Sequence, residues 1–289
     1  MATVTDFFLG ARPKTLTAAI APVSIGSALA IAEDNYSWDL IIGCLIVAVA
    51  LQIGVNYAND YSDGIKGTDS DRVGPMRLVG SGRATPKSVL VAMVIAFLVA
   101  SSAGIYVSLK SSPYLILVGI ACVVLAYLYT GTKYAYGYVG LGELVVLLCF
   151  GFVATIGTYF VNTQEVSFLI IVASLIPGFY SVAILLANNI RDIETDKVSN
   201  KKTLAVRIGK KNAVGIFTLV VMLIPIVVAV IGVTYPMVFI ALFFAASSVL
   251  LVSKIHKAQS PKDFISILIM TSMLNLIVSI TVSVLVVLS

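Results

Sequence analysis

The chain has 289 residues, of which 59% are hydrophobic and only 11% are charged. A typical soluble domain carries about 25% charged residues, so this composition excludes that class and indicates a membrane protein. The formal net charge is +5. Membrane topology accounts for this small basic excess, so we expect no nucleic-acid partner.

Apolar runs long enough to cross a membrane follow one another along the chain. A helix needs about 20 apolar residues to span a hydrocarbon core, whereas a barrel strand needs about 10 residues with alternating polarity. The runs are apolar at both odd and even positions, so we predict helices. We expect an all-α integral membrane protein that forms one domain over residues 1–289. Its nine transmembrane helices are predicted at 16–32, 39–58, 88–109, 113–130, 139–161, 166–187, 212–233, 237–253 and 264–287.

The basic residues predict how these helices are oriented. Lys and Arg lie before the first run and after the second, fourth, sixth and eighth runs, and these segments hold 18 of the 19. Only Lys110 falls on the opposite side. Because Lys and Arg are enriched in cytoplasmic loops, we expect the N-terminus and the two longest loops, 59–87 and 188–211, to be cytoplasmic.

Two acidic segments occur at equivalent places in these two loops. Residues 58–63 (Ala-Asn-Asp-Tyr-Ser-Asp) follow the second run, and residues 187–192 (Ala-Asn-Asn-Ile-Arg-Asp) follow the sixth run. Aligned without gaps, the two segments share their first Ala, the next Asn and the final Asp. The match predicts a weak internal repeat of four helices, with the ninth helix closing the chain.

The acids of these segments are expected to bind a divalent cation. If the second helix continues past the membrane surface, Asn56, Asn59, Asp60 and Asp63 share one face of it. The acids then lie at a helix C-terminus, where the helix dipole disfavours a carboxylate, and crowded carboxylates need a neutralising cation. Mg²⁺ held by one or two carboxylates together with a substrate phosphate meets this need. The alternative is that each acid is a solvated loop residue.

Basic and aromatic residues beside the acids add to this hypothesis. Arg72 and Lys201 suit phosphate oxygens, although the orientation rule alone explains most basic loop residues. Several tyrosines, including Tyr129, lie near the end of the fourth run. Their rings either face the site, where they could stabilise a carbocation by cation–π attraction, or form an aromatic belt at the membrane surface. Glu143 is the one ionisable residue placed clearly within a run, which makes it a functional candidate. The three cysteines lie in apolar runs, so we expect small core residues there.

Three motifs together resemble the UbiA superfamily of intramembrane aromatic prenyltransferases. They are Asn59-Asp60-x-x-Asp63, Asp192-x-x-x-Asp196 and the run Lys202-Thr203-Leu204-Ala205-Val206-Arg207. Within the superfamily, residues 11–16 and 56–79 look like the branch that prenylates 1,4-dihydroxy-2-naphthoate in menaquinone synthesis. The first motif departs from the usual pattern, because its third acidic position falls on Gly67 and the next acid is Asp69.

The resemblance implies a Mg²⁺-dependent enzyme that transfers a polyprenyl group from polyprenyl diphosphate to 1,4-dihydroxy-2-naphthoate. Loss of CO₂ then gives demethylmenaquinone. The prenyl tail would stay in the lipid bilayer of a bacterial cell membrane, with the active site on its cytoplasmic side. The implied catalytic and metal-binding residues are Asp60, Asp63, Asp192 and Asp196, with Asp69 as a further metal ligand; the diphosphate-binding residues are Asn56, Asn59, Arg72, Asn189 and Lys201; and the acceptor-binding residues are Lys133 and Tyr129.

Two alternatives remain open at this point. The acceptor could be another aromatic compound such as 4-hydroxybenzoate, since the chemistry of the motifs does not separate these rings. In a different class, the chain could be a secondary transporter, because transporters also contain internal repeats. A transporter is expected to carry ionisable groups near the middle of the membrane, and apart from Glu143 the predicted spans contain none.

Overall fold

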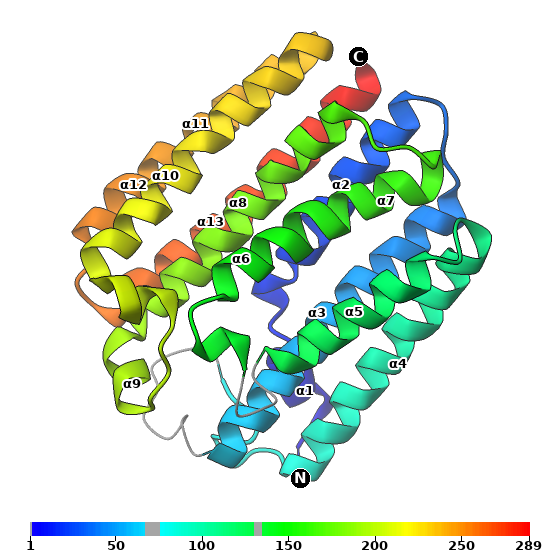
Figure 1. Cartoon of the computed structure of the whole chain (residues 1–289). Coiled ribbons are helices and arrows are strands. Elements are labelled where there is room, and N and C mark those ends of the chain that lie inside the picture. Colours follow the sequence, from blue (N-terminus) through cyan, green and yellow to red (C-terminus); the bar gives the residue numbers. More distant parts are fainter. Residues whose placement is uncertain (1, 67–75, 130–134) are drawn as a thin grey trace.

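Figure 1 shows the computed structural model, a bundle of long helices that lie side by side. The structure describes residues 2–66, 76–129 and 135–289. Every regular element within these residues is helical. The all-α fold class predicted from the apolar runs is therefore confirmed.

In chain order, the elements are α1 (Val4–Gly10), η1 (Pro13–Thr15), α2 (Thr17–Ala32), α3 (Trp38–Lys66), α4 (Pro86–Lys110), α5 (Leu115–Leu128), η2 (Tyr136–Tyr138), α6 (Gly142–Val146), η3 (Leu147–Val153, a π-helix), α7 (Ala154–Thr163), α8 (Phe168–Arg191), α9 (Ile193–Val198), α10 (Leu204–Thr234), η4 (Pro236–Ala241), α11 (Leu242–Ala246), α12 (Ser248–Lys257) and α13 (Pro261–Leu288).

The helices of the described residues account for seven or eight of the nine predicted membrane crossings. Within the described residues, seven helical segments are long and apolar enough to span a membrane. An eighth is counted if α1, η1 and α2 form one span, which is bent by 54°. Helix α5 overlaps the span predicted at 113–130, but it has only 14 residues, because it begins at Leu115 and ends at Leu128. By length and composition the chain is a multi-pass membrane protein, while the ninth crossing, the orientation and the repeat stay predictions.

Helix α8 lies at the centre of the larger hydrophobic core. It packs against α10 and α13, and α13 also packs along α2. The side chains of Tyr180 on α8 and Phe217 on α10 are fully buried there. On the other side of the bundle, α3 pairs with α4, and a smaller core joins the end of α3 to α1 and to the start of α4 (Figure 1).

Glycine allows α2 and α7 to approach each other closely. A Cβ atom placed on Gly26 would lie 2.4 Å from the carbonyl oxygen of Thr155 and 2.9 Å from Cβ of Thr158. Small residues at helix crossings are typical of membrane proteins, because helices in lipid associate largely through close packing. The contact fixes α2 against α7.

The polar elements gather at one end of the bundle. The N-terminus, α1 and α9 lie at this end, and the C-terminus lies at the opposite end (Figure 1). The last turns of α3 and α8 both reach the polar end. The fold therefore brings together the two acidic segments, which are about 130 residues apart in the sequence.

Candidate active site

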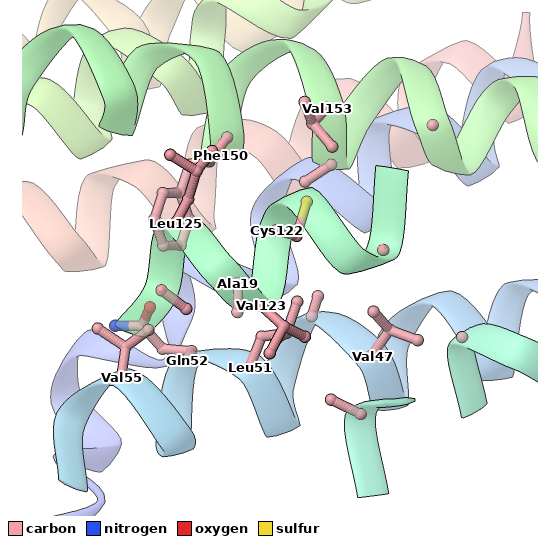
Figure 2. Close-up of a pocket in the computed structure, with 18 of the residues that line it drawn as sticks. Ala19, Val47, Leu51, Gln52, Val55, Cys122, Val123, Leu125, Phe150 and Val153 are labelled. Atoms are coloured by element: carbon pink, nitrogen blue, oxygen red, sulfur yellow. The ribbon is translucent and has the colours of Figure 1, made fainter. Parts of the chain in front are cut away.

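A large apolar cavity runs between the helices. Its volume is about 700 Å³, and α2, α3, α4, α5, α7, α8 and the π-helix η3 contribute to its walls. Figure 2 shows Leu51 and Val55 from α3, Leu125 from α5 and Phe150 from η3 around it. All three cysteines, Cys44, Cys122 and Cys149, line this cavity. The prediction that they fill the core was therefore wrong, because apolar surroundings do not distinguish a packed core from a cavity wall.

A smaller polar pocket of about 120 Å³ adjoins this apolar cavity. The two share wall residues, so one ligand could occupy both. Of the predicted site residues, the polar pocket is lined by Asp63, Asp192 and Asp196, by Asn59 and Asn189, and by Lys201 and Tyr129. The residues that line both spaces are Arg12, Thr15, Asn59, Tyr129, Leu185 and Asn188.

Asp63 is the centre of a network that links three distant parts of the chain. Its Oδ1 accepts hydrogen bonds from the Tyr138 hydroxyl at 2.8 Å and from Lys201 Nζ at 3.0 Å. Its Oδ2 lies 3.4 Å from Nη2 of Arg77. Only 3% of Asp63 is exposed, so these partners compensate a buried charge.

Tyr138 is held in the protonated state that this network requires. Burial raises the pKa of its hydroxyl well above the usual range, and the nearby carboxylate of Asp63 raises it further. The hydroxyl therefore donates to Asp63 at neutral pH. Lys201 Nζ also lies over the Tyr138 ring, 4.7 Å from its centroid, which adds a cation–π contact.

Asp60 has a different environment from Asp63. Its two oxygens accept hydrogen bonds from the backbone N–H groups of Leu78 and Val79, at 2.6 Å and 3.0 Å. The residue is 1% exposed and does not line the polar pocket. In this structure Asp60 anchors residues 78–79 to the end of α3, which gives no support to the predicted role as a metal ligand.

The second acidic segment forms the C-terminal end of α8, and Asp192 follows the last helical residue. Asp192 receives two hydrogen bonds of 2.7 Å from the guanidinium group of Arg191, whose side chain is only 3% exposed. Asp196 accepts a hydrogen bond of 3.4 Å from the hydroxyl of Thr203, one residue before α10. The backbone N–H of Lys201 donates to the carbonyl of Asp196 at 2.8 Å, and this turn directs Lys201 toward the first segment.

Two predicted diphosphate-binding asparagines have intramolecular partners. Nδ2 of Asn56 donates to the Ala11 carbonyl at 2.9 Å and so ties α3 to the segment before η1. Nδ2 of Asn189 donates to Oε1 of Glu143 at 2.9 Å. Asn56 lines the apolar cavity, whereas Asn189 lines the polar pocket. The predicted residues Asp69, Arg72 and Lys133 lie outside the described part of the chain.

The polar pocket contains functional candidates that the sequence alone did not select. Arg12, Arg77, Tyr138, Asn188 and Arg191 all line it. Arg12 also has a left-handed backbone conformation with φ of 55°, which is uncommon outside glycine and often marks functional sites. Arg12 lies inside residues 11–16, which carry part of the family resemblance, and Tyr138 is the last of the tyrosines near the end of the fourth apolar run. The sequence therefore contained a signal for each of these two residues.

The side chains of the polar pocket fit a Mg²⁺ ion that also binds substrate. Carboxylate and amide oxygens are the hard donors that Mg²⁺ prefers. Among the residues the structure describes, no group of three or more Asp, Glu, His or Cys side chains could hold an ion alone. A metal bound here would therefore use one or two carboxylates and need further oxygens from a ligand, as is usual for Mg²⁺ with phosphates.

Comparison with known proteins decides the family. The model of the UbiA prenyltransferase family matches residues 19–277, which is most of the chain. The chain belongs to the UbiA prenyltransferase family. The resemblance seen in the acidic motifs is thus confirmed.

Three curated relatives of this UbiA-family chain share one name. A protein of Mycobacterium leprae is 47% identical over 232 residues, which cover 77% of this chain and 79% of the relative. One of Mycobacterium tuberculosis is 49% identical over 209 residues, 72% of each chain, and one of Escherichia coli is 34% identical over 209 residues, 70% of this chain and 68% of the relative. All three are named 1,4-dihydroxy-2-naphthoate octaprenyltransferase.

Solved structures support the same fold. A UbiA homolog from Archaeoglobus fulgidus bound to GPP and Mg²⁺ superimposes with a TM-score of 0.70, covering 96% of this chain and 99% of that one. A UbiA homolog from Aeropyrum pernix also gives 0.70, with 94% and 97% covered. Both are 14% identical to this chain, so they establish the architecture alone.

Proposed function

We propose that this chain transfers a polyprenyl group from polyprenyl diphosphate to 1,4-dihydroxy-2-naphthoate, with release of diphosphate and CO₂. The observation that carries the proposal is the apolar cavity that meets a buried, charged polar pocket. A polyprenyl diphosphate has the same two parts, an apolar chain and a polyanionic head. The name shared by these three relatives supports naphthoate as the acceptor.

The donor would lie with its chain in the apolar cavity and its diphosphate in the polar pocket. The reacting carbon joins these two parts, so it would lie near the residues that line both spaces. Among them, Arg12 brings a positive charge and Tyr129 an aromatic ring. When bound, Mg²⁺ would neutralise charge on the diphosphate and make it a better leaving group. Asp63, Asp192 and Asp196 are the carboxylates placed to hold it.

The reaction is an electrophilic aromatic substitution. The bond between the first prenyl carbon and the diphosphate oxygen breaks, and its electron pair leaves with the diphosphate. Lys201, Arg77 and Arg191 line the pocket, where their charge favours the additional negative charge of the leaving group. The allylic cation is protected from water by the apolar wall and is attacked by the ring carbon that bears the carboxylate. Loss of CO₂ returns the electrons of its carbon–carbon bond to the ring and leaves the quinol form of demethylmenaquinone.

The proposed location is the cell membrane of a bacterium, with the polar pocket on the cytoplasmic side. The distribution of Lys and Arg supports this orientation. The apolar cavity, in which the prenyl chain would bind, can then stay at membrane depth, while a water-soluble acceptor arrives from the cytoplasm.

Prenyl transfer by the purified chain in liposomes tests the proposal. Labelled polyprenyl diphosphates of different lengths would be supplied with 1,4-dihydroxy-2-naphthoate or with 4-hydroxybenzoate, and the labelled product would be extracted and identified. We expect a decarboxylated naphthoquinol product that disappears in EDTA and returns with Mg²⁺. Transfer to 4-hydroxybenzoate instead would contradict the acceptor assignment, and full activity without divalent metal would contradict the metal role.

A further inference from the structure

Glu143 is buried beside the polar pocket, but it does not line it. It lies on α6 with only 6% of its surface exposed. Oε1 accepts the hydrogen bond from Nδ2 of Asn189, and Oε2 is buried without a hydrogen-bond partner within the part of the chain that the structure describes. A buried carboxylate oxygen without a partner is costly, and an ionisable residue within a candidate membrane span is a functional candidate. The proposed prenyl transfer assigns it no role.

The contact determines which end of the Asn189 side chain can face the pocket. A side-chain amide has an NH₂ group that only donates and an oxygen that only accepts. Because the NH₂ group of Asn189 donates to Glu143, which is outside the pocket wall, this contact directs the NH₂ end toward Glu143 and favours the oxygen as the end that faces the pocket. An oxygen favours a cation, whereas an NH₂ group would favour a phosphate oxygen directly.

We propose that Glu143 is a positioning residue that holds the Asn189 amide with its oxygen toward the polar pocket, where it assists in binding a divalent cation. This inference rests on the proposed function for the cation and the diphosphate. It also changes the role of Asn189, which the family resemblance assigned to the diphosphate. A residue that orients a metal-binding group through a hydrogen bond commonly changes metal affinity about 10- to 100-fold when it is replaced.

Glu143→Gln loosens this orientation at nearly constant size, because a carboxylate can only accept from Asn189, whereas a glutamine can either accept from its NH₂ group or donate to its oxygen. The test uses purified full-length protein in detergent and a labelled thiolo analogue of geranyl diphosphate that does not ionise. The Mg²⁺ concentration that gives half-maximal retention of the analogue is measured without any acceptor. We expect E143Q to raise this concentration about 10-fold. Glu143→Asp, which keeps the charge but withdraws it by one methylene, should raise it as well.

A double-mutant cycle separates positioning from a merely structural role. If Glu143 acts through Asn189, E143Q should change the Mg²⁺ requirement less than about 2-fold in the Asn189→Ala background. Tyr180→Phe is the matched control, since it removes another buried hydrogen bond, that of the Tyr180 hydroxyl with Ser248 at 2.9 Å, and neither residue lines the pocket. Its Mg²⁺ requirement should match the unmodified protein. Size-exclusion chromatography reports whether each variant is folded.

Three results would overturn the inference. An unchanged Mg²⁺ requirement in both folded E143Q and folded E143D would show that the contact does not matter for the cation. An equal shift with and without Asn189 would show that Glu143 acts by its charge alone. Unmodified protein that fails to retain the analogue with Mg²⁺ would contradict the proposed function itself, whereas a failure to prenylate naphthoate would leave the result for Glu143 intact.

Discussion

Two aspartates three residues apart illustrate what the sequence could specify at single positions. Both Asp60 and Asp63 belong to the first motif, and helical spacing placed both on the same face of α3. The structure separates them by their partners: Asp63 meets Lys201 and Tyr138, while Asp60 binds two backbone N–H groups. Spacing along a helix identifies a face, but it does not identify what the rest of the chain brings to that face.

This difference predicts that substitution of Asp63 by asparagine mainly lowers turnover, whereas the same substitution of Asp60 mainly lowers stability. Asp63→Asn should lower turnover by at least ~100-fold, the scale of losing one major electrostatic stabiliser. Asp60→Asn weakens hydrogen bonds from backbone N–H groups to a charged oxygen, each worth about 1.5–3 kcal/mol, and should mainly lower the melting temperature. Both variants would be compared in a prenyl-transfer assay and by thermal unfolding in detergent. A normal melting temperature together with a lost Mg²⁺ response in D60N would return Asp60 to the set of metal ligands.

At the level of helices, hydrophobic runs predicted where elements lie better than how many cross the membrane. The runs at 39–58, 88–109 and 166–187 correspond to α3, α4 and α8. The run at 113–130 yields the short helix α5. Apolar side chains facing lipid, core or cavity look alike in a sequence, which is also why the cysteine positions were misinterpreted. Close contacts such as that between Gly26 and α7 depend on tertiary packing and could not be predicted.

The contact at Gly26 gives a prediction at this level. Gly26→Ala should force α2 away from α7, because the added Cβ would lie 2.4 Å from a backbone oxygen. Overpacking of this kind costs about 1–3 kcal/mol, so the melting temperature should fall and less protein should be recovered. Gly157→Ala on α7 is the control, since its Cβ would meet no atom within 4 Å. Equal melting temperatures for the two variants would show that α2 and α7 are not held as described.

The whole molecule combines an apolar cavity and a charged polar pocket that share wall residues. The apolar cavity lies among helices that the apolar runs predicted, and residues from the ends of both α3 and α8 line the polar pocket. The motifs predicted most of the acids and asparagines of the pocket, because those residues recur in the two segments. They could not predict the pairs of Asp63 with Arg77 and Tyr138, which require the folded chain.

The central claim is that one donor fills both spaces at once, and the cysteines of the cavity allow a direct measurement. Cys122 and Cys149 line the apolar cavity, so a membrane-permeable maleimide should label them. Labelling of each cysteine would be followed by mass spectrometry with polyprenyl diphosphate and Mg²⁺, with the corresponding prenyl alcohol, and in the Asp63→Asn variant. We predict that polyprenyl diphosphate slows labelling at least ~10-fold, that EDTA or D63N abolishes this protection at the same donor concentration, and that the alcohol protects weakly. Labelling at an unchanged rate with saturating donor and Mg²⁺ would contradict the account.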